Sequence, residues 1–445
     1  MGEQRQAMKD TPTTSPSSYC DYSNYSSGFP AHNEEEEAVY DFQAFVTQLK
    51  DPRADPILRY TRSFLTNFTT KRDLWTCDEQ RKLVDDFKVF AFDKLRLYEP
   101  FKSLDSGRLK NAQEGIEKLI MGKLYNQCFS PSLKQRFNEK LDEGHNRDLL
   151  QDALLEEKRA EYRFIDPEFL EFPQPLSNRL QKFSQLAGKE LSRVNEYKAP
   201  RDKMVCILNA CRVLFGFLKH SGLANGGADE FVPVLVYTLL KSDVKNLVSN
   251  LNYIERFRFA EFLQGESSYY LSSVQGASNF VATLGRESLQ ITDPAGFEAR
   301  YRENQEALEV ERARIGTSNP TPEIKTDAAD TPARTTSPGS VPSEYIRRPL
   351  DEATSAIISK FSELFASNGP TADMPQQIQD TSAAADEDAE STRLVQELQN
   401  QENKRVLREL HSMFPDMDEE LIFDVCEAKK YRIGVCVDTL LTLSS

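Results

Sequence analysis

The sequence predicts an all-α protein: a helical bundle packed on a second helical domain, then a disordered linker and a small three-helix domain. Apolar residues recur three and four positions apart through the two larger domains and again near the C-terminal end. The bundle segment contains no β-hairpin pattern. Hydrophobic residues make up 39% and charged residues 28% of the 445 residues, a low apolar content that predicts sizeable segments without a packed core.

The N-terminal part divides into an arm and a bundle. Residues 1–37 are rich in Ser, Thr, Pro, Tyr and acid, and we expect them to form a disordered acidic arm. A passive tail and a regulatory role are both open for this arm. A helical bundle is expected over residues 38–148, because one-sided apolar stripes follow one another there. The first stripe is Phe42, Phe45, Val46 and Leu49.

A second helical domain is expected over residues 149–290. One of its stripes consists of Met204, Ile207, Leu208, Cys211, Phe215 and Leu218. The segment 231–240 is apolar nearly all round, which is typical of a helix buried at the centre of a domain. A continuous apolar run also fits a strand, but the helical neighbours on both sides favour a helix.

The C-terminal third is predicted to be a linker followed by a very small domain. Residues 291–402 are expected to be mostly disordered, with one short amphipathic helix near 350–366. That helix would either dock on its own chain or bind a partner or a membrane surface, and both alternatives are open. Residues 403–445 hold three short apolar stripes, which predict a three-helix domain with a small core.

Composition and motifs exclude several classes of function. With a net charge of −15, the chain is a poor ligand for nucleic acid or anionic lipid. Neither a signal peptide nor a run of apolar residues long enough to span a membrane is visible, so we expect a soluble, cytoplasmic protein that reaches membranes through partners. The seven cysteines and four histidines show no zinc spacing, so we expect neither metal nor cofactor.

No apparatus for covalent chemistry is visible. Gly188-Lys189 does not belong to a phosphate-binding loop, because Phe183 stands where that motif needs glycine and Glu190 where it needs a hydroxyl. Nucleophile-elbow, kinase and zinc-protease motifs are missing from the sequence as well. We therefore expect a protein that acts by binding.

Three positions in the second domain stand out from its apolar stripes. Asp229 lies at the expected start of the buried helix, where exposed N–H groups favour a carboxylate. Pro233 is placed within about the first turn of that helix, where a missing N–H costs least. A helix start alone also explains both residues. Tyr269 lies just off the stripe that contains Tyr270, so its ring is a candidate surface anchor.

Separated segments of this domain resemble, in the same order, the catalytic domain of the vacuolar protein sorting nine (VPS-nine) family. These segments are Pro200–Lys203, Gly227–Tyr237, Ser249–Phe257 and Gly265–Leu271. Members of that family are guanine-nucleotide exchange factors for Rab GTPases of the Rab-five class. The resemblance implies that Asp229 is the family's acidic finger and that Tyr269 touches the switch region of the GTPase. It also implies that Pro233, Asn250 and Glu230 lie at the GTPase-binding groove.

The C-terminal domain shows a second resemblance. Its Met413-Phe414-Pro415 and Leu440-Leu441 could all be core residues, but so small a domain would leave an apolar edge exposed. The pattern resembles the CUE family of ubiquitin-binding domains. That resemblance implies that Met413, Phe414, Pro415, Leu440 and Leu441 contact ubiquitin.

The order of bundle, exchange domain, linker and CUE domain is similar to fungal members of the VPS-nine family. The resemblance implies a cytoplasmic exchange factor, recruited peripherally to endosomes, that releases GDP from a Rab-five-type GTPase and binds ubiquitin and ubiquitylated cargo in endosomal and vacuolar sorting. No cofactor and no covalent step are implied. The alternative is a ubiquitin-binding endosomal adaptor that binds a Rab without catalysing exchange.

Overall fold

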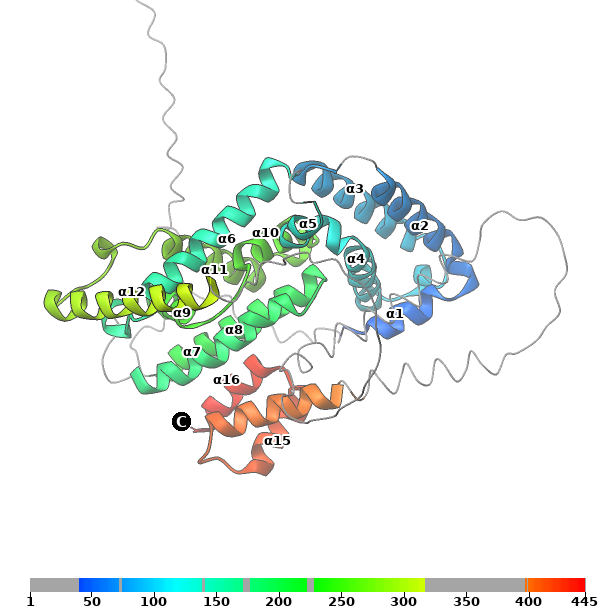
Figure 1. Ribbon diagram of the computed structural model, residues 1–445. Coiled ribbons are helices and arrows are strands. Elements are labelled where there is room, and N and C mark those ends of the chain that lie inside the picture. Colours follow the sequence, from blue (N-terminus) through cyan, green and yellow to red (C-terminus); the bar gives the residue numbers. More distant parts are fainter. Residues whose placement is uncertain are drawn as a thin grey trace, which may run out of the picture. The chain divides into compact units, whose positions relative to one another are not determined.

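A computed structural model gives the arrangement of the chain (Figure 1). It describes residues 40–71, 74–137, 141–170, 177–221, 228–316, 397 and 399–444. Every regular element in these ranges is a helix and none is a strand, which confirms the predicted all-α class. The predicted arm 1–37 and the amphipathic helix near 350–366 lie outside the described residues.

The N-terminal bundle is built from helices of very different length. They are α1 (Phe42–Leu49), α2 (Asp55–Thr70), α3 (Cys77–Leu95), α4 (Ser106–Cys128) and α5 (Ser130–Phe137). Side chains set where two of them begin: Asp41 caps α1, and Thr76 forms a capping box with Glu79 at the start of α3. The apolar faces of α1, α2, α3 and α4 meet in one buried cluster.

The core of the bundle continues onto the second domain. Tyr253 and Phe257 of α10 (Leu247–Phe257) belong to the same buried cluster as the bundle residues. Lys88 of α3 is buried, and its Nζ donates to the backbone carbonyl of Phe257 at 2.8 Å. The predicted boundary at 148/149 falls inside α6 (Glu143–Tyr162), so the bundle and the second domain share a helix as well as a core.

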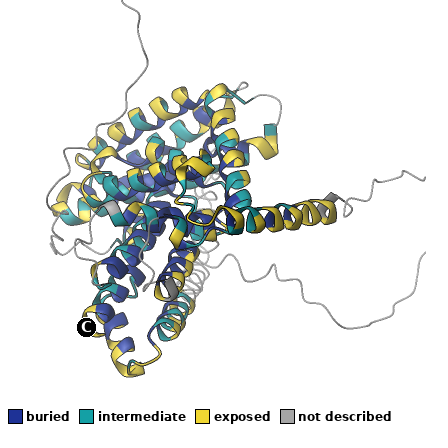
Figure 2. Cartoon of the chain, turned by 90° about the vertical axis from the view of Figure 1, so that its left-hand side faces the viewer, coloured by how far each residue is buried: buried dark blue, intermediate teal, exposed yellow. Residues whose placement is uncertain are grey.

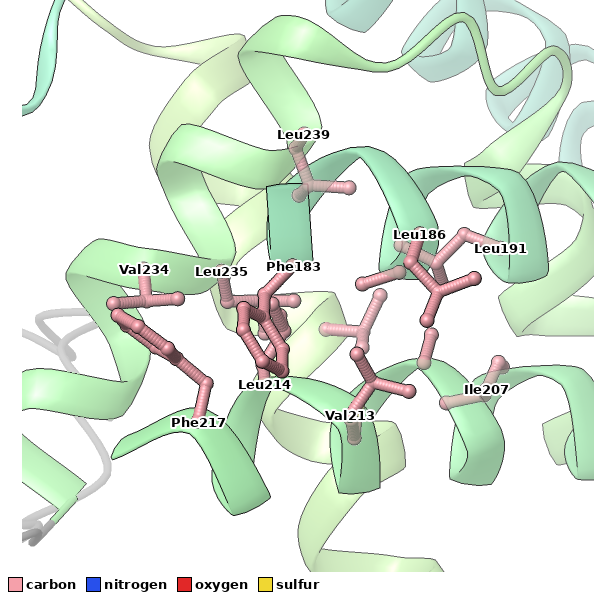
Figure 3. Close-up of a cluster of buried hydrophobic side chains, with 14 of the residues drawn as sticks. Phe183, Leu186, Leu191, Ile207, Val213, Leu214, Phe217, Val234, Leu235 and Leu239 are labelled. Carbon is pink, nitrogen blue, oxygen red and sulfur yellow. The ribbon is translucent and has the colours of Figure 1, made fainter. Parts of the chain in front are cut away.

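The second domain has its own interior around α8. Its remaining helices are α7 (Ser177–Ser192), α8 (Pro200–Lys219), α9 (Ala228–Lys241) and α11 (Glu266–Ala282). Pro200 occupies the first position of α8, where its fixed φ and missing N–H suit a helix start. Side chains from α7, α8 and α9 interlock in this interior, among them Phe183, Leu214 and Leu235 (Figure 3). The segment 231–240, apolar on almost every side, is the body of α9, which confirms the helix predicted there.

The linker begins later than expected, because α12 (Pro294–Gly316) occupies residues assigned to it. Phe297, Asn304 and Leu308 of α12 are buried, and Nδ2 of Asn304 donates to two backbone carbonyls of α6 at 3.0 and 2.9 Å. The prediction was wrong here because the apolar stripe is narrow and most other positions of α12 are charged or polar.

The C-terminal domain contains the three helices expected there. They are the helical stretch 399–413, α15 (Glu419–Ala428) and α16 (Ile433–Ser444). α16 packs along α8, and the two helices lie side by side in Figure 1. Buried residues of the C-terminal helices therefore belong to the same cluster as the interior of the second domain. Figure 2 shows how the helices carry buried residues on one side and exposed residues on the other.

Buried ion pairs join the bundle to the second domain. Glu117 of α4 is fully buried and accepts hydrogen bonds from Nη1 of Arg258 at 2.9 Å and from the backbone N–H of Phe259 at 2.8 Å. Glu114, one turn earlier, also pairs with Arg258 and accepts from Nε of Arg201 at 2.8 Å. These carboxylates neutralise arginines that α10 and α8 bring to the contact.

We predict that Glu117→Ala lowers the free energy of unfolding by about 3–5 kcal/mol, because Arg258 would stay buried with one carboxylate removed. Urea unfolding followed by circular dichroism measures this change. The control is Arg59→Ala, which breaks the exposed pair with Asp55 and should change stability by less than about 1 kcal/mol. Equal effects of the two substitutions would contradict a structural role for the buried pair.

Candidate functional site

An open apolar groove lies along α9. Val232, Pro233 and Val236 of α9 line it together with Phe280 of α11 and the short segments 169–170 and 287–290. The groove has a volume of about 480 Å³. Val232 and Phe280 are 39% and 37% exposed, so large apolar side chains face solvent here. Such a groove is suited to binding an apolar segment of a partner.

The start of α9 lies one helical turn before the residues of α9 that line this groove. α9 begins at Ala228, so Asp229 is its second residue, as the sequence predicts. Positions 229, 232, 233 and 236 follow helical spacing and share one face of α9. Pro233, expected within about the first turn, is the sixth residue of α9, where its missing N–H removes one helical hydrogen bond. Pro233 is nevertheless part of the helix and lines the groove.

Tyr269 lies in the first turn of α11, beside α9. The helix follows Gly265, whose φ of 57° is in the left-handed region that glycine adopts without strain. The ring of Tyr269 is half-buried and stacks on Phe231 of α9 with the ring centroids 6.1 Å apart. Burial raises the pKa of the Tyr269 hydroxyl, which stays protonated at neutral pH. Tyr270 is 5% exposed and belongs to the core, as predicted.

A bidentate ion pair fixes the beginning of α11 to α8. Nε and Nη2 of Arg212 donate to the two carboxylate oxygens of Glu266 at 2.9 and 2.6 Å. Glu266 is the first residue of α11, three positions before Tyr269. Sequence reasoning missed this pair because no spacing signal connects residues this far apart. Sequence reasoning also missed Phe280 in the groove. The available signal was that Phe280 is a large apolar residue next to Val281 but outside the apolar stripe of α11.

Asn250 does not line the groove along α9, and its assignment to a GTPase-binding groove stays a prediction. Asn250 is fully buried, and its Oδ1 accepts from Nζ of Lys203 at 2.6 Å. Its Nδ2 donates to Oδ1 of Asn195 at 3.0 Å and to the carbonyl of Asn246 at 2.8 Å. The buried Lys203 needs Oδ1 of Asn250 as an acceptor, which explains the asparagine by internal hydrogen bonding. Glu230 is half-buried on α9, next to Asp229.

The residues assigned to ubiquitin binding differ in their exposure. Pro415 is exposed and Met413 is partly exposed, whereas Phe414 is 9% exposed. Leu440 and Leu441 on α16 are both buried, Leu440 fully and Leu441 at 1% exposure. The expected apolar edge is therefore accessible to solvent at Met413 and Pro415, whereas the side chains of Leu440 and Leu441 are buried.

Neither a candidate metal site nor a helix that could span a membrane occurs among the described residues. No group of three or more His, Cys, Asp or Glu side chains in these ranges could hold a metal ion. In the same ranges, no helix combines the length and apolar character that crossing a membrane requires.

The fold and the groove define a helical protein with an open apolar surface groove, and family models identify domains in it. Residues 184–286 match the vacuolar sorting protein 9 (VPS9) domain, and residues 403–444 match the CUE domain. Residues 59–125, within the bundle, match a domain of unknown function. The chain therefore contains a VPS9 domain that includes α8, α9 and α11, followed by a CUE domain.

Several curated proteins are similar to the chain. Vacuolar protein sorting-associated protein vps901 of Schizosaccharomyces pombe is 39% identical over 280 residues, which cover 63% of this chain and 48% of that protein. Vacuolar protein sorting-associated protein 9A of Arabidopsis thaliana is 29% identical over 275 residues, covering 61% and 48%. The human Rab5 GDP/GTP exchange factor is 27% identical over 240 residues, covering 53% and 45%. The alignments span about half the length of these relatives.

The buried position of Asn250 leads to a prediction about stability. Asn250→Ala should lower the free energy of unfolding by about 1–3 kcal/mol, because Nζ of Lys203 loses a buried acceptor. Asn279→Ala, at an exposed position of α11, is the control and should change stability by less than about 0.5 kcal/mol. Thermal and urea unfolding measure both. Wild-type stability in Asn250→Ala would show that the amide is dispensable for the fold.

Proposed function

We propose that the chain is a guanine-nucleotide exchange factor for a Rab GTPase of the Rab-five class. One observation carries the proposal: within the segment matching the VPS9 domain, the face of α9 that includes position 229 lines an open apolar groove. Similarity to a protein named Rab5 GDP/GTP exchange factor supports the choice of GTPase class.

The proposed reaction is the release of GDP without any covalent step. A GTPase holds its nucleotide through backbone N–H groups, a lysine and Mg²⁺ around the phosphates. Nanomolar affinity corresponds to about 12 kcal/mol, so an exchange factor must bind the empty GTPase better than the loaded one. We assign Asp229 the role of acidic finger. Its carboxylate would repel phosphate, disfavour Mg²⁺ and pair with the lysine that nucleotide loss leaves exposed.

The apolar groove and Tyr269 complete the proposed site. The groove beside Pro233 would hold the displaced switch segment by burying its apolar side chains. Tyr269, half-buried against Phe231, would contact the same segment through its ring edge and hydroxyl. We keep Glu230 as a peripheral groove residue because it adjoins Asp229 on α9.

We further propose that the CUE domain binds ubiquitin through Met413, Phe414, Pro415, Leu440 and Leu441. Ubiquitin on cargo would then recruit the cytoplasmic factor to endosomes, where its GTPase acts in protein sorting. The competing candidate is a ubiquitin-binding adaptor that holds a Rab without releasing its nucleotide. The carboxylate at position 229 favours exchange, because apolar contacts suffice for mere binding.

The exchange proposal predicts that Asp229→Ala slows GDP release by at least about tenfold, which is a loss of about 1.4 kcal/mol of transition-state stabilisation. The measurement follows a fluorescent GDP analogue leaving a Rab-five-type GTPase in the presence of the full-length chain. Tyr269→Ala should also slow release. The control is Asp93→Ala, which removes an exposed carboxylate from α3 in the bundle.

Three results distinguish the candidates. Fast release by the wild type and by Asp93→Ala, with slow release by Asp229→Ala, supports exchange through the acidic finger. Equal rates for all variants would remove Asp229 from the mechanism. Binding of the GTPase without faster release by the wild type would favour the adaptor.

The CUE assignment predicts that Met413→Asp abolishes ubiquitin binding by the full-length chain, because a carboxylate would face the apolar surface of ubiquitin. GDP release should keep its rate, since Met413 is not part of the groove. Fluorescence anisotropy of labelled ubiquitin measures binding, with Glu420→Gln at an exposed position of α15 as the control. Undiminished binding by Met413→Asp would refute the assignment.

A further inference from the structure

One face of α16 is turned toward α8. Gly434, Asp438 and Leu441 are four and three positions apart, so they lie on the same side of α16. A Cβ atom built on Gly216 of α8 would lie 3.6 Å from Cδ1 of Leu441 and 3.7 Å from Cα of Asp438. Leu441, one of the two leucines assigned to ubiquitin binding, therefore contacts α8 and is 1% exposed.

Glycines allow the two helices to approach closely. A Cβ built on Gly434 would lie 2.8 Å from Cβ of Arg212 and 3.2 Å from the backbone oxygen of Asn209, so no larger residue fits there without a shift. On α8, the three atoms nearest to a Cβ built on Gly216 all belong to α16. Each helix thus has a glycine at the contact, Gly216 on α8 and Gly434 on α16. The absence of side chains there lets the two helices pack as closely as elements of a protein interior.

Charged side chains form further contacts between the C-terminal domain and the helices α7 and α8. Nη2 of Arg405 lies 2.9 Å from Oε1 of Glu190, a carboxylate of α7 that is fully buried. Nζ of Lys189 lies 2.9 Å from the carboxylate of Glu409. Asp438 faces α8's C-terminal end, where Nζ of Lys219 and Nε2 of His220 are each 3.5 Å away. Arg405 neutralises a charge inside the second domain, so the contact includes buried as well as exposed pairs.

We propose that α8 is an intramolecular ligand for the face of the CUE domain that carries Leu441, and that α8 and ubiquitin exclude each other from it. The inference rests on the proposed ubiquitin binding. Ubiquitin can reach Leu441 only after α16 leaves α8, because the side chain is covered in the docked state. The affinity of the full chain for ubiquitin is then lower than that of the undocked domain by the fraction of chains in the open state.

A reversible cross-link tests this competition. In the double variant Gly216→Cys, Asp438→Cys, the new Cβ at 216 would lie 3.7 Å from Cα of residue 438, within reach of a disulfide. Oxidation should hold α16 on α8 and weaken binding of labelled monomeric ubiquitin by at least about tenfold, and reduction should restore wild-type affinity. Mass spectrometry under non-reducing conditions verifies the bond, and each single cysteine variant is a control.

A second variant should act in the opposite direction. Gly216→Glu adds a charged side chain at the contact while leaving the CUE domain unaltered, so ubiquitin should bind several-fold more tightly than to the wild type. Equal affinity of the oxidised and reduced double variant, with the cross-link formed, would overturn the competition and leave ubiquitin binding intact. Failure of the cross-link to form would contradict the docked arrangement. No binding by the reduced protein and the wild type would overturn the proposed ubiquitin function itself.

Discussion

Helix α8 packs against α7, α9, α10 and α11 of its own domain, α4 of the bundle and α16 of the C-terminal domain. A helix enclosed in this way needs apolar residues on most of its faces and a partner for each polar one. Lys203 shows how the second need is met: Nζ donates to the carbonyl of Val194 at 2.7 Å and to Oδ1 of Asn250, and it lies 4.9 Å from the ring centroid of Phe129. The helices that carry the groove, α9 and α11, rest on this enclosed helix.

The bundle holds the first turn of the same helix through charges. Nζ of Lys118 on α4 lies 2.8 Å from Oδ2 of Asp202, while Arg201 reaches Glu114. Burial alone would raise the pKa of Asp202, but the ion pairs with Lys118 and Arg201 outweigh burial and lower it. Buried pairs of this kind add little net stability over apolar packing, but they require one relative position of their partners. The bundle is therefore a specific support for α8 and, through it, for the groove.

Helical periodicity predicted most of the fold, because each stripe is a local property of the sequence. The stripe at Phe45, Val46 and Leu49 is buried as expected, and the apolar segment 231–240 is the body of α9. Contacts between residues far apart in the sequence leave no local pattern comparable to an apolar stripe. Asn250 is assigned to a GTPase-binding groove because residues around it match a family motif, whereas no local pattern indicates its hydrogen bond to Lys203, which lies 47 positions earlier. The narrow stripe of α12 was obscured by the charged residues around it.

The candidate site was predictable only in part for the same reason. Asp229 and Tyr269 stand out locally, one at a helix start and one off an apolar stripe, and the roles we propose for them remain predictions. The groove itself is formed by α9, the end of α11 and two short segments that come together only in the folded chain. A cluster of this kind has no signature at a fixed spacing. Exposed apolar residues such as Phe280 become recognisable as a surface only once the neighbouring helices are in place.

Arg212 connects the two contacts that α8 makes with functional elements. Its Cβ lies against Gly434 of α16, and its guanidinium holds Glu266 at the start of α11. Departure of α16 would remove van der Waals contact from the stem of this side chain, while both hydrogen bonds to Glu266 lie within the VPS9 domain and would remain. The start of α11, and with it Tyr269, should then keep its place on α9. In the proposed competition, docking of the CUE domain changes which surfaces are accessible, and we expect the groove to keep its shape when α16 leaves α8.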